Sequence, residues 1–173
     1  EWSYSNQVIK LLNFIIEKNN TIKNNSIIEK NFIENSDLKN KNIILRVDWN
    51  IPFDSSTYKI NDDFRITSSL KTIKYIFNQN PNRILIISHL GRPKNNEDKK
   101  YSWYNFLNQL QKYFEENICF LEKGIHHDSL YELNSNKYKL YLCENIRFHK
   151  EETNFNNDND KIKIFNEMGN IFI

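Results

Sequence analysis

The segment that decides the fold of this chain reads Arg83-Ile84-Leu85-Ile86-Ile87-Ser88-His89-Leu90-Gly91-Arg92-Pro93-Lys94. Its first part is a short apolar run without alternation, which is typical of a parallel strand buried on both faces. Gly91 then permits a tight turn, and a His, an Arg and a Lys follow the strand within a few residues. Ligands of open α/β sheets bind at the carboxyl ends of strands, so the segment predicts a small cationic pocket there.

A second apolar run, residues 43–47, ends in the same way, in Asp48-Trp49-Asn50-Ile51-Pro52. A third, residues 139–143, leads into Glu144-Asn145-Ile146-Arg147-Phe148-His149. Because parallel strands bring their carboxyl ends to one edge of the sheet, these polar loops are expected to share one site that holds a small anion.

The rest of the pattern alternates strands with helices. We expect strands at residues 43–47, 83–88, 117–121, 139–143 and 170–173, and helices at 65–78, 101–115, near 127–133 and at 158–168. Apolar residues recur at three- and four-residue steps in the first helix, and Asp62 and Asp63 supply acidic capping before it. The alternation predicts an α/β, Rossmann-like fold: a doubly wound parallel sheet with helices on both faces, in three layers.

Residues 1–35 are interpreted as an N-terminal extension, a short helix followed by an Asn-rich linker, and residues 36–173 as one globular domain. The apolar run at residues 8–16 is explained by an amphipathic helix or by the remnant of a targeting segment. The chain opens on Glu1 and closes on an apolar run. We therefore expect a fragment that is also cut at its C-terminal side.

Composition excludes several classes of function. The 24 Lys and Arg against 22 Asp and Glu give a net charge of +2, which disfavours nucleic-acid binding. No apolar stretch is long enough for a transmembrane helix. Cys119 and Cys143 lie in apolar segments without metal-ligand spacing, so we expect reduced core thiols and no metal site.

Arginine is scarce among the cations, and its positions are therefore informative: Arg46, Arg65, Arg83, Arg92 and Arg147. A guanidinium grips two oxygens of a carboxylate or phosphate at once. If the loops and the start of the first helix converge, Arg65, His89, Arg92 and Arg147 face one cavity that suits a ligand with a phosphate and a carboxylate. A carboxylate among them, Asp48, is an acceptor for a ligand hydroxyl or orients a neighbouring Arg.

Each of these residues also has a purely structural interpretation. The alternatives are an ordinary polar loop residue for His89, a surface cation for Arg65, an ion pair with Glu144 or Glu151 for Arg147, a turn cap for Asp48 and a buried structural partner for Arg46.

Four motifs occur in a specific order: Arg46-Val47-Asp48-Trp49-Asn50-Ile51-Pro52, Asp63-Phe64-Arg65-Ile66, Ser88 to Lys94, and Glu144 to His149 followed by Glu151-Glu152. Together they resemble the N-terminal, substrate-binding domain of the phosphoglycerate kinase family, over about residues 27–173. Trp49, Ile51 and Ile146 depart from the family's usual Phe, Val and Leu.

The resemblance implies roles for individual residues. Arg65 would be the catalytic arginine that stabilises the transferred phosphoryl group, while Asp48 and Asn50 would hold the hydroxyl and carboxylate end of the substrate. His89, Arg92 and Arg147 would bind the 3-phosphate as a basic patch, with Arg46 as a further position. The substrate-binding set also contains Trp49, Leu90 and Gly91.

The resemblance also implies a reaction, reversible phosphoryl transfer between 1,3-bisphosphoglycerate and ADP that gives 3-phosphoglycerate and ATP in glycolysis. Mg²⁺ would accompany ATP or ADP in a C-terminal, nucleotide-binding domain that this sequence lacks, so the fragment alone should bind phosphoglycerate without turnover. We expect a cytoplasmic monomer, with a plastid or another organelle as the alternative location. The alternative function is a non-catalytic, truncated relative that acts as an anion-binding or interaction module.

Overall fold

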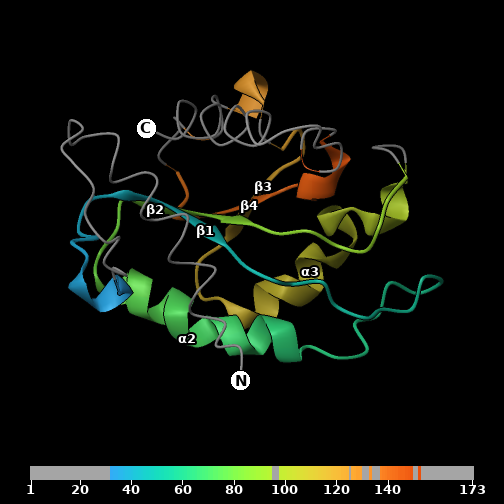
Figure 1. Ribbon diagram of the computed structural model, residues 1–173, viewed down its shortest axis with the longest axis horizontal. Helices are drawn as coiled ribbons and strands as arrows, with labels where there is room; N and C mark the ends of the chain where they lie inside the picture. Colours follow the sequence, from blue (N-terminus) through green and yellow to red (C-terminus); the bar gives the residue numbers. More distant parts are fainter. Residues whose placement is uncertain are drawn as a thin grey trace, which may run out of the picture.

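A parallel four-stranded sheet forms the centre of the molecule (Figure 1). The computed structural model describes residues 32–94, 98–124, 126–129, 133, 137–149 and 152. The strands are β1 (Asn42–Arg46), β2 (Arg83–Ile87), β3 (Ile118–Leu121) and β4 (Leu140–Cys143). Their order in the sheet is β1-β2-β4-β3, and all three pairings are parallel. The predicted α/β fold is confirmed.

The register of the sheet decides which loops meet. Arg46 of β1 pairs with Ile87 of β2, and Ile86 pairs with Leu142 of β4. The carboxyl ends of these three strands therefore lie level with one another. The loops that follow β1, β2 and β4 start side by side at one edge, with β3 beyond β4 at the outside.

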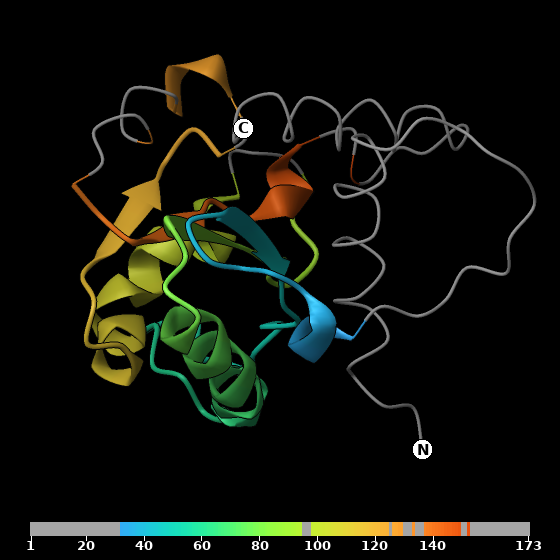
Figure 2. The same ribbon diagram turned by 90° about the vertical axis from the view of Figure 1, so that its left-hand side faces the viewer.

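One face of the sheet is covered by α2 (Phe64–Asn78) and by the helical segment that contains α3 (Leu107–Leu110) (Figures 1 and 2). Both connections move the chain in the same direction across the sheet, and right-handed crossovers then place both helices on the same side. The core on this face combines sheet residues with Ile66, Ile73 and Ile76 of α2 and with Trp103, Phe106 and Leu110.

The opposite face has its own core. Ile44, Leu85 and Tyr141 point to this side of the sheet, and they pack with Leu133 and with Ile146. Because successive side chains of a strand alternate between the two faces, burial on both sides explains why the central parts of β1, β2 and β4 are continuous apolar runs, whereas the edge strand β3 is mostly half-buried.

The expected helix over residues 101–115 is wrong as a single element. The chain instead forms three consecutive short turns, 3₁₀ at Trp103–Phe106, α at Leu107–Leu110 and 3₁₀ at Gln111–Tyr113. The Gln111 side chain accepts a hydrogen bond from the Ile118 N–H (2.9 Å) and donates to the Glu116 carbonyl (2.9 Å). These contacts turn the chain out of the helix toward β3.

Of the two acidic residues predicted to cap α2, only Asp62 caps the helix with its side chain. Asp62 accepts a hydrogen bond from the Phe64 N–H (2.8 Å), at the first residue of the helix. The Asp63 carboxylate instead accepts from the Tyr113 hydroxyl (2.6 Å). Desolvation and this hydrogen bond raise the pKa of Tyr113 to about 12.

Several expected elements lie outside the described residues: the extension up to residue 31, the helix at 158–168 and the strand at 170–173. Of the helix expected near 127–133, the structure describes a 3₁₀ turn at His127–Ser129 and helical backbone at Leu133. Ile33, which was assigned to the extension, packs against the core.

The two cysteines should differ in reactivity in the folded chain. Neither is in a disulfide; Cys143 is buried and Cys119 is half-buried. Burial, followed by the neighbouring Glu144 carboxylate, raises the pKa of the Cys143 thiol, and only a thiolate attacks an alkylating reagent. Mass spectrometry after iodoacetamide treatment should show native chain modified at Cys119 first and at Cys143 only after urea is added. Equal native rates at both thiols would contradict the core on this face.

Candidate functional site

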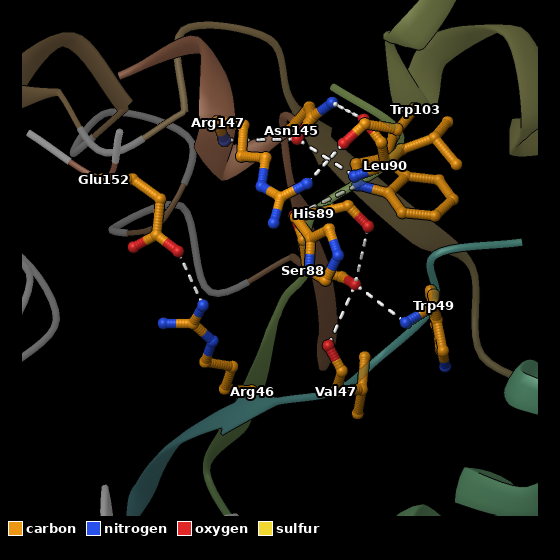
Figure 3. A network of polar contacts seen from close by, with 11 residues as sticks. Arg46, Val47, Trp49, Ser88, His89, Leu90, Trp103, Asn145, Arg147 and Glu152 are labelled. Carbon is orange, nitrogen blue, oxygen red and sulfur yellow. Dashed lines mark hydrogen bonds and ion pairs between the residues drawn. The ribbon is translucent and has the colours of Figure 1, made fainter. Parts of the chain in front are cut away.

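Ser88, directly after β2, joins the three loops at the carboxyl edge of the sheet (Figure 3). Its buried hydroxyl accepts a hydrogen bond from the Trp49 N–H (3.0 Å) and donates to the Val47 carbonyl (2.9 Å). Its own carbonyl accepts from the Ile146 N–H (3.2 Å). One small residue therefore holds the loop after β1 and the loop after β4 against the end of β2.

Asn145, directly after Glu144, ties the same loops with its side chain. It is fully buried, and its Oδ1 accepts from the N–H groups of Leu90 (3.1 Å) and Arg147 (3.2 Å). Its Nδ2 donates to the carbonyls of Leu90 (2.8 Å) and Tyr101 (2.9 Å). These bonds use the two donors and two acceptor positions of a carboxamide completely. Asn145 thus fixes where Leu90 and Arg147 stand relative to each other.

Glu144 anchors the third segment. Its carboxylate is buried and accepts hydrogen bonds from the Ser102 hydroxyl (2.5 Å), the Trp103 N–H (2.9 Å) and the Asn145 N–H (2.7 Å). Bonds to a carboxylate are stronger than those between neutral groups. Glu144 therefore fixes the segment at Ser102 and Trp103 to the end of β4. The alternative in which it pairs with Arg147 is wrong.

Gly91 occupies the point where two predicted site residues meet. Its N–H donates to Asn50 Oδ1 (2.8 Å), and its carbonyl accepts from Arg147 Nη1 (2.5 Å). Its φ of +58° is in the left-handed region, and a Cβ at this position would overlap the Tyr101 ring. A side chain here would therefore disturb both contacts.

His89 lies beside Arg147 at this edge (Figure 3). Burial is the main cause that lowers the pKa of its imidazole, followed by the positive charge of Arg147; Arg46 acts in the same direction more weakly. The carboxylates of Asp48 and Glu152 oppose the shift. His89 therefore lies among charged groups from β1 and from the loops after β1 and β4, and its lowered pKa favours the neutral imidazole.

Asp48 and Arg65 form an ion pair between the loop after β1 and the first turn of α2. The Asp48 carboxylate also accepts from the Asn50 N–H (3.3 Å). Of the roles left open for Asp48, the orientation of an arginine and the stabilisation of a turn are both present. The side chains of Asp48 and Arg65 remain 27% and 39% exposed, so both can still meet a ligand.

The other predicted residues divide into three groups. Arg92 is exposed and makes no hydrogen bond or ion pair with any residue that the structure describes. Arg46 pairs with Glu152 (2.6 Å), as the interpretation of a structural partner required. The side chains of Trp49 and Leu90 are in the core, 1% and 0% exposed, which leaves only their backbone atoms near the site.

The sequence pattern predicted no structural role for Ser88 or Asn145, and it offered Glu144 only as a possible partner of Arg147, although all three lie inside the quoted motifs. A usable signal was present, since these are the first polar residues after an apolar run, where the next loop must be held.

The arrangement suits a small, strongly charged anion. His89, Arg92 and Arg147, together called the basic patch here, lie on two loops that Asn145 joins. Within the described ranges, no group of three or more His, Cys, Asp or Glu side chains is placed to hold a metal ion. In the same ranges, every helix is too short or too polar to cross a bilayer.

Comparison with known proteins gives a consistent result. A family model described as phosphoglycerate kinase matches residues 33–173. The phosphoglycerate kinase of Coprothermobacter proteolyticus is 37% identical over 139 residues, which are 80% of this chain and 34% of the relative. That of Yarrowia lipolytica is 36% identical over 140 residues, 80% of this chain and 33% of the relative. The chain thus spans about a third of the length of these curated relatives.

Solved structures agree with these matches. Phosphoglycerate kinase from Pyrococcus horikoshii superposes with a TM-score of 0.67 at 22% identity, over 81% of this chain and 34% of that one. This likeness concerns the fold. The enzyme from Coxiella burnetii gives a TM-score of 0.53 at 30% identity, over 70% of this chain and 30% of the other.

Removal of the Asn145 side chain should cost stability. Asn145→Ala leaves the buried N–H and C=O groups of Leu90 without their partners, and each such group costs about 1–3 kcal/mol. We expect the free energy of unfolding in urea to fall by about 2–4 kcal/mol. The matched control, Asn78→Ala at the exposed end of α2, should change it by less than about 0.5 kcal/mol. Equal effects of the two substitutions would contradict the role of Asn145.

The lowered pKa of His89 predicts a pH dependence of stability. Below the unfolded value of about 6.5, the unfolded chain binds a proton that folded His89 does not yet bind, so stability declines as the pH falls through this window. Below the folded pKa both states are protonated, and this contribution stops changing. Urea unfolding between pH 7.5 and pH 5 should show a smaller decline for His89→Gln than for the wild type. An equal decline in both would place the pH dependence elsewhere.

Proposed function

This chain belongs to the phosphoglycerate kinase family, and from that premise we propose that it supplies the phosphoglycerate site for reversible phosphoryl transfer between 1,3-bisphosphoglycerate and ADP, which gives 3-phosphoglycerate and ATP. The observation that carries the proposal is that His89 lies close to both Arg147 and the Asp48–Arg65 pair at one edge of the sheet, with Arg92 on the same loop as His89. Cations from two loops and from α2 can there serve both ends of a short, phosphorylated acid.

The basic patch would bind the 3-phosphate. Arg92 is exposed, and the one hydrogen bond that the Arg147 guanidinium makes within the described residues goes to a neutral carbonyl, so both guanidinium groups retain donors for phosphate oxygens. Burial, followed by the positive charge of Arg147, lowers the pKa of His89, which favours the neutral imidazole before a ligand binds. A bound phosphate dianion would reverse that balance and raise the pKa of His89, so that the imidazole takes up a proton and joins the patch as a third cation.

The other end of the site would act on the transferred group. Phosphoryl transfer requires the reacting groups to be positioned and their spread negative charge to be neutralised, with little covalent participation by the protein. Arg65 is suited to this neutralisation because Asp48 holds its guanidinium while leaving it partly exposed. Asp48 and Asn50 would contact the hydroxyl and carboxylate end of the substrate, next to Arg65.

We assign the nucleotide and its Mg²⁺ to no residue of the described chain. The carboxylates at the site are already engaged, Asp48 with Arg65 and Glu144 with the segment at Ser102 and Trp103. These residues do not fit a metal ion, and the proposed role of the domain is limited to the phosphoglycerate side.

Calorimetric titration of the chain with 3-phosphoglycerate tests the proposal. The wild type should bind at one site, and affinity should fall as salt is added because the ligand carries several charges. Arg147→Ala should weaken binding about 10- to 100-fold, the expected loss for a charge-assisted hydrogen bond. Arg92→Ala combined with Arg147→Ala should abolish it.

Two controls make this titration decisive. Lys74→Ala removes an exposed cation of α2 away from the patch and should leave the affinity unchanged. Arg147→Lys keeps the charge but loses the guanidinium fork, so it should bind more tightly than Arg147→Ala and more weakly than the wild type. Wild-type affinity in the double variant, with its circular dichroism spectrum intact, would refute the assigned site.

A further inference from the structure

A carboxylate stands within the cationic region of the site. Glu152 Oε1 lies 2.6 Å from Arg46 Nη2, across 106 residues of sequence (Figure 3). The Glu152 side chain is only 12% exposed and that of Arg46 is 32% exposed. Because water reaches this pair poorly, its charges are screened less than those of a surface ion pair.

The pair lies close enough to His89 to act on its charge. Arg46 lowers the pKa of the imidazole and Glu152 raises it, so their effects on His89 oppose each other. Arg46 lies on the last position of β1, level with Ile87, two residues before His89. A cation that the fold places next to the basic patch is therefore largely neutralised by Glu152.

We propose that Glu152 sets how tightly the site binds anions, by holding Arg46 and so making a bound anion compete with an internal carboxylate. The inference rests on the proposed function, in which the basic patch binds the 3-phosphate. A bound phosphate gains from its contacts with Arg92, Arg147 and His89, but Glu152 repels it and neutralises the charge that Arg46 would otherwise offer it.

The opposite role for Glu152 would be to orient Arg46 toward the ligand. The two roles predict opposite effects of Glu152 on the affinity for the anion and on the contribution of Arg46 to that affinity. Under competition, loss of the negative charge at residue 152 strengthens anion binding and makes Arg46 more important. Under orientation, the same change weakens binding and makes Arg46 less important.

Glu152→Gln separates the two roles. The substitution keeps the shape of the side chain and an oxygen that can accept from Arg46, but it removes the charge. The dissociation constant for 3-phosphoglycerate should fall roughly three- to tenfold, as expected for one partly screened charge near the ligand. Arg46→Gln should weaken binding less than twofold in the wild type and several-fold in the Glu152→Gln background. The control is Glu122→Gln, which removes an exposed carboxylate after β3. It should change neither the dissociation constant for 3-phosphoglycerate nor the effect of Arg46→Gln on that constant.

A ligand-free measurement tests the same contact. In an NMR titration, Glu152→Gln should lower the pKa of His89, because the carboxylate that opposes the cations is gone. A merely structural role for Glu152 would leave this pKa in place. An unchanged His89 pKa, or binding of 3-phosphoglycerate that is unchanged or weaker in Glu152→Gln, overturns the inference.

Failure of the proposed function would look different. If the wild type does not bind 3-phosphoglycerate, or binds it without need of Arg92 and Arg147, the proposed function is wrong. The inference is then tested with inorganic phosphate in place of 3-phosphoglycerate, because phosphate requires only the cations of the site for binding. Tighter phosphate binding in Glu152→Gln supports the competition, and equal or weaker binding overturns it.

Discussion

The site depends on one buried carboxamide. The Asn145 carboxamide makes four hydrogen bonds, all to backbone groups of Leu90, Tyr101 and Arg147. The loops after β2 and β4 carry several cations that repel one another, and a side chain buried in the core holds both loops in place. The fold thus separates the groups that set the geometry, which are buried, from those that we propose to bind the ligand, which are half-buried or exposed.

The same separation explains how several cations share one edge of the sheet without a ligand. Arg65 is offset by Asp48, Arg46 by Glu152, and Arg147 by a backbone carbonyl, while the lowered pKa of His89 favours its neutral form. Like charges so close together would otherwise repel, and each internal acceptor reduces that cost. Under the proposed function, an anion that binds here competes with these acceptors, so the contacts that stabilise the ligand-free site also limit its affinity for the anion.

Much of this could be predicted from the sequence because buried parallel strands are continuous apolar runs. The expected strand at 43–47 is shifted by one residue from β1, and the expected strand at 83–88 is one residue longer than β2. The loops that bring His89 and Arg147 together follow from the order of the strands. The break-up of residues 101–115 depends on the Gln111 and Glu144 side chains, which act on distant backbone groups. The partner of Arg46 lies 106 residues away, and no local pattern identifies it.

Whether three loops form one anion site is tested most directly by following the backbone amide signals of Asn50, Gly91 and Arg147 by NMR while 3-phosphoglycerate is added. All three signals should shift along one binding curve with a single dissociation constant. Shifts confined to one loop, or different dissociation constants for the three, would contradict a single shared site.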